Sequence, residues 1–299
     1  MFLTFYLTMA SPQLSTIESV INDTRLICYS PSEFNPQTGL LPNAESIRQD
    51  LATVRPYFSG IITYGVNNDP HGFIPRIAQA LDFQAVILGI WDPKSMDEMQ
   101  LAIEQTRQYP NLVVGLCVGN EGLIFKRYSW QDLTEAIQII RKSLPNVPIT
   151  TTEPLSQYGK TPALLQIVDF HFPNIHPYWE FSSDKSNPKQ CANWVFKEAK
   201  RLQTAQTKKP LIIKESGFPS DGDTSCSSEF QAEFWLALSD LMKNQREIGF
   251  AFFEAFDARE WKANEMGSPV ESHWGLWTQT RQPKGIIEQL PQLPFTRQE

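Results

Sequence analysis

Short apolar runs alternate with amphipathic stretches along almost the whole chain of 299 residues. Each run is short and rich in β-branched residues, which is typical of strands buried on both faces. Because such strands need helices over them, the alternation predicts a parallel sheet covered by helices. Eight strands are expected, at Leu26–Tyr29, Gly60–Tyr64, Ala85–Trp91, Leu112–Glu121, Val147–Glu153, Val168–His176, Pro210–Glu215 and Gly249–Phe256.

Apolar residues recur at helical spacing between these runs, with start signals in front of several segments. Asn43 is placed as an N-cap, and Ser95 with Glu98 and Ser129 with Asp132 have the spacing of capping boxes. Only 161–167 is free for a helix in the fifth unit. The expected helices are Ala44–Tyr57, Ser95–Tyr109, Ser129–Leu144, Pro188–Ala205, Ser227–Lys243 and Pro283–Leu290.

Eight strand–helix units in a chain of this length predict a single (β/α)8 TIM barrel of the α/β class. A doubly wound open sheet would alternate in the same way, but 30–36, after the first strand, lacks the glycines of a phosphate-binding loop. We assign residues 25–299 to the barrel. Residues 1–24 are expected to be an N-terminal extension, either disordered or packed as a lead-in to the barrel.

The formal charge of −7 argues against nucleic acid and anionic membranes as partners, because both attract basic surfaces. A neutral substrate and a monomeric protein are expected. No run of 18 apolar residues is present, so no transmembrane segment is predicted. The apolar start, 1–10, has no Lys or Arg before Arg25, whereas a secretory signal begins with basic residues. This favours a cytoplasmic location and leaves export open.

Neither a metal nor a cofactor is predicted from the histidines and cysteines. The four histidines lack the spacing of a zinc motif, and the four cysteines lack metal-ligand spacing. Cys28 and Cys117 lie in predicted strands and are expected to be buried thiols. Cys191 and Cys226 lie in or near polar connections, and a disulfide between them is left open.

Two glutamates end two of the buried runs. Glu121 closes 112–120, and Glu215 closes 211–214 and opens onto Ser-Gly-Phe-Pro at 216–219. A carboxyl group at the end of a buried strand is costly to desolvate, so its presence needs a reason. Two such groups at one edge of a sheet suit acid/base and nucleophilic work on a glycosidic bond.

Other polar and aromatic residues follow the same strand ends, which meet at one mouth of a barrel. Aromatic faces stack on sugar rings, so at least two of Trp91, Trp179, Trp261, Trp274 and Trp277 are expected to line a cleft; the competing interpretation is core packing. Strand-end polar groups can also cap helices instead of binding ligands. The strand-end set comprises Tyr29, Tyr64, Trp91, Asp92, Asn120, Glu153, Asn174, His176, Tyr178, Trp179, Glu254 and Asp257.

Four of these strand-end segments carry a resemblance to a known family. They are Val-Gly-Asn-Glu at 118–121, Asn-Ile-His-Pro-Tyr-Trp at 174–179, Lys-Glu-Ser-Gly-Phe-Pro-Ser at 214–220 and Phe-Phe-Glu-Ala-Phe-Asp at 252–257, with His-Trp-Gly-Leu at 273–276 in support. The chain resembles glycoside hydrolase family 17, among the retaining barrel glycosidases, in a form similar to the microbial members.

The resemblance implies that Glu121 is the general acid/base and Glu215 the nucleophile. Asn120 would bind the 2-hydroxyl of the sugar, Tyr178 would lie near the nucleophile, and Glu254 would bind sugar. The implied substrates are β-1,3-glucans and related β-glucans or their oligosaccharides. We add Tyr29, Tyr64, His176, Trp179 and Trp274 as substrate-binding candidates because they follow strand ends or lie in the matching segments.

Three alternatives stay open beside a hydrolase that retains configuration. The same site would serve a β-1,3-glucanosyltransferase, a degenerate barrel would bind glucan without cleaving it, and a related barrel would act on mannan or cellulose. The short fifth unit leaves little room for the extra subdomain of the plant enzymes. Lys214 precedes the nucleophile, and strand alternation predicts that its side chain points away from the site.

Overall fold

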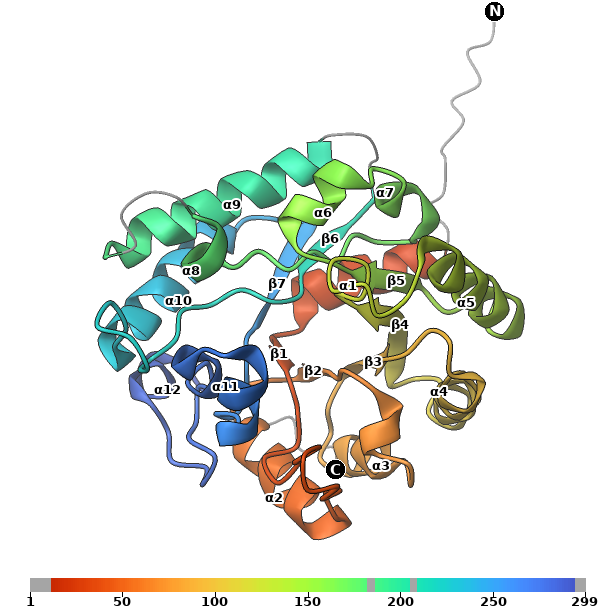
Figure 1. The fold of residues 1–299 in the computed structure, drawn as a ribbon, viewed down its shortest axis with the longest axis horizontal. Helices are drawn as coiled ribbons and strands as arrows, with labels where there is room; N and C mark the ends of the chain where they lie inside the picture. The colour runs from red at the N-terminus through yellow and green to blue at the C-terminus, as the bar shows by residue number, and fades with distance from the viewer. Residues whose placement is uncertain (1–11, 182–185, 205–208, 294–299) are drawn as a thin grey trace, which may run out of the picture.

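The computed structural model describes residues 12–181, 186–204 and 209–293. Within these ranges seven parallel strands form one curled sheet in the order β5-β4-β3-β2-β1-β7-β6, and helices ring it (Figure 1). The fold is therefore α/β and barrel-like, as expected. The strands are β1 (Leu26–Cys28), β2 (Gly60–Ile62), β3 (Ala85–Ile90), β4 (Val113–Asn120), β5 (Ile149–Thr152), β6 (Leu211–Ile213) and β7 (Ile248–Phe252).

The strand predicted at Val168–His176 is not a regular strand in the structure. This segment lies between β5 and β6 and makes isolated bridges, among them those of Asn174 with Pro154 and with Glu215. Pro173 has no N–H to donate, and a proline interrupts a regular ladder. Seven strands of the predicted eight are therefore confirmed, each of them shorter than expected.

Helices cover the outer face of the sheet, all but one of them close to where the spacing predicts them; the exception, α3 (Phe73–Ala80), lies where no helix was predicted. Asn43 caps the helix α2 through bonds from the amides of Glu45 and Ser46, and Ser129 forms a full capping box with Asp132. The covering helices are α2 (Ala44–Val54), α3 (Phe73–Ala80), α4 (Met96–Gln108), α5 (Trp130–Ser143), α9 (Pro188–Thr204), α10 (Ser228–Met242) and α12 (Gly285–Gln289). Residue 205, the expected end of α9, lies outside the described residues.

The capping box expected at Ser95 is only half formed. Its hydroxyl accepts the amide of Glu98 at 3.2 Å. The Glu98 carboxylate turns instead to the amides of Trp91 and Asp92, each at 2.9 Å, and so holds the loop after β3. The capping-box spacing therefore predicted the start of the helix correctly, but it did not predict that the Glu98 carboxylate would bond to the loop after β3.

Short helices follow several strand ends. The fifth unit contains two of them, in place of the single helix expected at 161–167. These short elements are η1 (Val66–Asn68), α6 (Leu155–Lys160), α7 (Leu164–Ile167), α8 (Pro177–Glu180), α11 (Glu260–Met266) and η2 (Pro269–Ser272). None of the described helices has both the length and the apolar character needed to cross a bilayer.

The helix α1 (Pro12–Asp23) lies across the amino-terminal end of the sheet, within the part assigned to an extension. Ile17 and Val20 are buried and join the cluster enclosed by the strands, and Asn22 donates to the carbonyl of Arg246 just before β7. Residues 1–11 of the expected extension lie outside the described residues. The enclosed cluster is Ile17, Val20, Leu26, Cys28, Ile62, Ala85, Ile87, Cys117, Phe170, Phe172, Ile212, Ala251, Phe253 and Trp274.

Candidate active site

Glu121 and Glu215 meet around a single asparagine at the carboxyl ends of the strands. Glu121 follows the last residue of β4, and its backbone is left-handed, with φ of 52°. Asn174 donates its side-chain amide to Oε1 of Glu121 at 2.8 Å. The backbone of Asn174 is bridged to Glu215, whose carbonyl accepts the amide of Ile175 at 2.8 Å. The segment 173–176 thus holds both glutamates at one site.

Glu215 lies in a buried, positively charged setting. Lys214 donates to its Oε1 at 2.9 Å, and Nε2 of His176 lies 3.4 Å from its Oε2. Burial alone would raise the pKa of Glu215, but the Lys214 ammonium and the His176 ring outweigh it and lower the pKa to about 2. The carboxyl group is therefore ionised at any ordinary pH.

Glu121 has the opposite setting. Burial raises the pKa of its carboxyl group above the usual value, and the negative charge of Glu215 raises it further. The bond from Asn174 and the positive charges of His176 and Lys214 act the other way without cancelling these effects. Two carboxyl groups whose environments move their pKa values apart can divide the roles of acid and anion between them.

Lys214 belongs to this site, which corrects the prediction that its side chain points away. Its ammonium group donates both to Glu215 and to Oδ1 of Asn120, and it lies 4.1 Å from the ring centre of Tyr64. Ile212 on β6 faces the enclosed cluster and Ile213 the opposite side, so alternation itself directs Lys214 inwards. Glu215, two residues beyond the end of β6, departs from the alternation and points to the same place.

The turn after Glu121 is held by a buried carboxylate that the sequence did not single out for this role. Glu153 accepts the amides of Leu123 at 2.8 Å and Ile124 at 3.2 Å. Burial, with a smaller contribution from the charge of Glu121, raises the pKa of Glu153 to about 7. Asn174 was likewise missed as a site residue, although its position at a strand end was the available signal.

Several predicted binding residues gather around the two glutamates. Oδ1 of Asn120 accepts a hydrogen bond from the same ammonium group of Lys214 that donates to Glu215, so the Asn120 side chain lies close to Glu215. The ring of His176 packs against Phe253 and Trp274, each at 5.1 Å between centroids. Tyr178 packs edge-on against Trp274 at 6.1 Å, which links the short helix α8 to the site.

Glu254 and two tryptophans have different degrees of access. Glu254 is buried, and its carboxylate accepts a hydrogen bond from the Lys262 ammonium at 2.8 Å, so the two residues form a pair. Trp274 is only 1% exposed and is part of the enclosed cluster, whereas Trp179 is 49% exposed beside Tyr178. Trp179 can therefore offer a ring face to a ligand, and Trp274 supports His176 from below.

The structure does not bring Tyr29 to the site. Its side chain is fully buried, and its hydroxyl donates to Asp50 on α2 at 3.0 Å, on the helix-facing side of the sheet. The preceding residue, Cys28, is part of the enclosed cluster, and alternate residues of a strand face opposite sides. The parity of β1 thus directs Tyr29 outwards.

None of the four cysteines, all of which the structure describes, forms a disulfide, and this includes Cys191 and Cys226. The disulfide left open between these two is therefore absent from the structure. In the part of the chain that the structure describes, no group of three or more His, Cys, Asp or Glu side chains is arranged to hold a metal ion.

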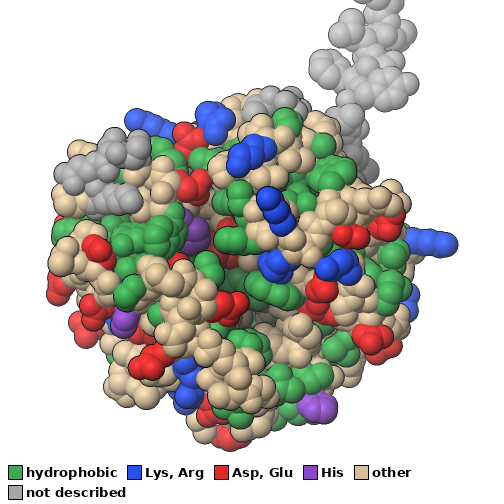
Figure 2. Space-filling view, viewed as in Figure 1, with side chains coloured by type: hydrophobic (Ala, Val, Ile, Leu, Met, Phe, Trp, Pro, Cys, Tyr) green, Lys and Arg blue, Asp and Glu red, His purple; other side chains and the backbone are tan. Residues whose placement is uncertain are grey.

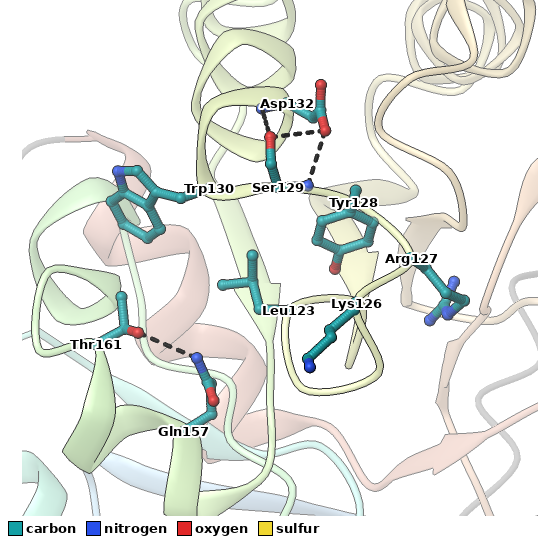
Figure 3. A pocket seen from close by; sticks show the side chains of 9 residues that line it. All are labelled: Leu123, Lys126, Arg127, Tyr128, Ser129, Trp130, Asp132, Gln157 and Thr161. Carbon is teal, nitrogen blue, oxygen red and sulfur yellow. Dashed lines mark hydrogen bonds between the residues drawn. The ribbon is translucent and has the colours of Figure 1, made fainter.

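A hollow marks the face that carries these strand ends. Figure 2, drawn from the same direction as Figure 1, shows this face hollowed near the middle, with hydrophobic and charged side chains around the hollow. A pocket of about 550 Å³ lies beside the turn after Glu121 and involves Leu123, Lys126 and Arg127 on the loop between β4 and α5 (Figure 3). Arg127 also stacks on Trp91, 4.0 Å from the ring centre.

Comparison with known proteins places the chain among glycoside hydrolases. A model of the BtgE/BtgC glycoside hydrolase domain matches residues 27–275. The glucan 1,3-beta-glucosidase BGL2 of Candida albicans is 27% identical over 277 residues, which cover 84% of this chain and 88% of the relative.

Solved structures agree in fold. A glycoside hydrolase family 17 beta-1,3-glucanosyltransferase from Rhizomucor miehei has a TM-score of 0.69 at 21% identity, covering 87% of this chain and 95% of its own. An active-site mutant of that enzyme in complex with laminaritriose gives the same TM-score at 22% identity and the same coverage. The chain therefore belongs to the BtgE/BtgC glycoside hydrolase domain family, and it is a glycosidase of the family 17 type that its strand-end motifs resemble.

Proposed function

We propose that this protein cleaves β-1,3-linked glucan by a double displacement in which Glu215 is the nucleophile and Glu121 the general acid/base. The observation that carries the proposal is the opposite electrostatic setting of two neighbouring carboxyl groups. Lys214 and His176 lower the pKa of Glu215, while burial and the charge of Glu215 raise the pKa of Glu121. An ionised nucleophile beside a protonated acid is the starting state that a retaining glycosidase needs.

The first step follows from these protonation states. A carboxylate oxygen of Glu215 bonds to the anomeric carbon while the bond from that carbon to the leaving oxygen breaks, and Glu121 gives its proton to the leaving oxygen. The second step reverses the roles. Water attacks the anomeric carbon, its proton goes to Glu121, and Glu215 leaves with the electron pair as a carboxylate. Two inversions at one carbon retain its configuration.

The surrounding residues suit sugar binding. In the proposal the Asn120 amide contacts the 2-hydroxyl, His176 and Tyr178 border the bound ring, and the exposed face of Trp179 stacks on a further sugar. Glu254 and its partner Lys262 provide a charged pair for hydroxyl groups. The irregular segment 169–175 completes the barrel as its eighth member, a role supported by its backbone bonds to Ile149 at 2.8 Å and to Ile212 at 2.9 Å.

The choice of β-1,3-glucan rests on the relatives, which are named as glucan 1,3-beta-glucosidases. A second activity on the same site is transfer of the glycosyl group to another sugar. The similarity in fold to the Rhizomucor miehei protein, which is named as a beta-1,3-glucanosyltransferase, favours it. Transfer needs only that the hydroxyl of an acceptor sugar replaces water in the second step.

Two variants test the assignment. Glu215→Gln should lower turnover of laminari-oligosaccharides by at least about 10³-fold with the fold intact, because an amide is not a nucleophile of this kind. Glu121→Gln should lose far less activity on dinitrophenyl β-laminaritrioside than on laminaritriose, because dinitrophenolate leaves without a proton. Rates would be measured from released phenol and from product mass spectra, with the exposed Glu135→Gln as the control.

The same spectra separate the two activities, since products longer than the substrate mean transfer. Unchanged turnover in Glu215→Gln would refute the nucleophile assignment. Equal losses of Glu121→Gln on both substrates would refute the acid role. Inactivity of the wild-type protein on every β-1,3-glucan would refute the substrate.

A further inference from the structure

Lys214 has a fully buried ammonium group that is bonded to the proposed nucleophile. Its side chain is 1% exposed, and its Nζ donates to Oε1 of Glu215 at 2.9 Å and to the side-chain carbonyl of Asn120. The ring of Tyr64 lies against it at 4.1 Å. Burial alone would lower the pKa of Lys214, but the charge of Glu215 reverses this, so the ammonium stays protonated.

Within the described residues, Glu215 is the one anionic group bonded to this ammonium. Cys28 on β1 and Cys117 on β4 border it as neutral thiols, since burial raises the pKa of each well above the usual value. Glu254, beyond the end of β7, is paired with Lys262 instead. A charge in a dry interior depends strongly on its partner, and removal of the partner leaves it uncompensated.

The proposed reaction removes that partner halfway through the cycle. When Glu215 becomes an ester of the sugar, its negative charge disappears, and Lys214 keeps its positive charge with only neutral groups bonded to it, while the newly ionised Glu121 attracts it without a bond. The ammonium therefore stabilises the free carboxylate more than the ester. When water attacks the anomeric carbon and the bond to Glu215 breaks, the returning electron pair restores the ion pair.

We propose that Lys214 is a positioning residue that sets the balance between the two steps: it makes Glu215 a weaker nucleophile and a better leaving group, so the glycosyl-enzyme does not accumulate. The inference rests on the proposed double displacement.

The substitution Lys214→Met removes the charge and keeps a chain of similar reach. With dinitrophenyl β-laminaritrioside, stopped-flow absorbance should show a burst of about one phenolate per enzyme molecule, followed by a steady rate at least about tenfold below wild type, the equivalent of one pKa unit of leaving-group stabilisation. The control is Lys209→Met, at the other end of the same segment, whose ammonium contacts carbonyls only, such as that of Val168 at 2.6 Å. It should behave like wild type.

A Lys214→Met variant that turns over substrate but shows no burst of phenolate would overturn the inference. The wild-type protein gives a second test that does not depend on the variant's folding. Its turnover of aryl β-laminaritriosides should rise with leaving-group ability up to dinitrophenol and show no burst, because the second step is fast. A wild-type burst, or turnover indifferent to the leaving group, would overturn the inference while leaving the two glutamates in their roles. Absence of any wild-type turnover would instead refute the proposed function on which it rests.

Discussion

At the scale of single residues, the site depends on how neighbours distribute protons between two carboxyl groups. Glu215 has an ammonium and an imidazole against it, and Glu121 has an amide donor and a neighbouring negative charge. The setting of Glu121 could not be read from the sequence, because Asn174 and His176 come from segments far from it. Lys214 is the neighbour of Glu215, but its side chain was expected to point away. That the two glutamates meet at one site could be predicted, since each was expected at the carboxyl end of a buried strand.

These settings predict the pH dependence of the reaction. The acidic limb of kcat/KM reports loss of the Glu215 anion and should lie below the ordinary value of 4.5, because the pKa of Glu215 is lowered to about 2. The basic limb reports loss of the Glu121 proton and should lie above 4.5, because the pKa of Glu121 is raised. The pH profile of kcat/KM should therefore have a plateau that includes pH 4.5.

Initial rates on laminaritriose from acidic to neutral pH would test this, with circular dichroism at each pH to confirm the fold. A profile that falls as pH rises through 4.5, or one that requires a group with a pKa near 4.5 to ionise, would contradict the assignment of charges.

At the scale of elements, most helices and strands could be predicted because their periodicity is local. The errors have specific physical causes. Val168–His176 alternates like a strand but contains Pro173, which breaks the ladder into isolated bridges. Tyr29 follows a strand end but faces α2. Its neighbour Cys28 faces the enclosed cluster, so the alternation of side chains along β1 directs Tyr29 to the opposite side. Lys214 keeps the inward parity of Ile212, and it is Glu215, beyond the end of β6, that departs from the alternation.

The start of α2 offers a test of the local signals. Asn43 accepts the amides of Glu45 and Ser46, each at 2.9 Å, so Asn43→Ala leaves two helix donors without their partner. We expect a loss of about 1 kcal/mol in the free energy of unfolding, measured with urea. Asn43→Asp keeps the acceptor and should lose little. Equal stability of the alanine variant and the wild-type protein would show that the cap contributes nothing.

At the scale of the whole molecule, the two ends of the sheet differ: a helix packs against one end, and the candidate active site lies at the other. The helix α1 packs Ile17 and Val20 into the enclosed cluster at the amino-terminal end, and the site occupies the carboxyl-terminal end. Gly249 on β7 leaves room for this contact, since a Cβ there would come within 3.0 Å of Ile21. No helix was predicted in this part of the chain, which was expected to be an extension, either disordered or packed.

This packing predicts that α1 contributes to the stability of the whole barrel. Ile17→Ala removes a fully buried side chain from the enclosed cluster and should lower the free energy of unfolding by about 3 kcal/mol, seen as an earlier urea midpoint with an unchanged slope. The exposed Ser19→Ala on the same helix should change it by no more than about 0.5 kcal/mol. Similar effects of the two substitutions would mean that α1 is not part of the cooperative core.

The left-handed backbone conformation at Glu121 lowers the stability of the fold at a residue that the proposed reaction requires. Residues other than glycine rarely adopt this conformation, which costs them on the order of 1 kcal/mol, and here the residue also keeps a carboxyl group partly buried. Glycine at this position would be free of both penalties and would lack the acid. Selection for heat resistance alone would therefore favour glycine over this glutamate, whereas the proposed role as the acid requires the glutamate.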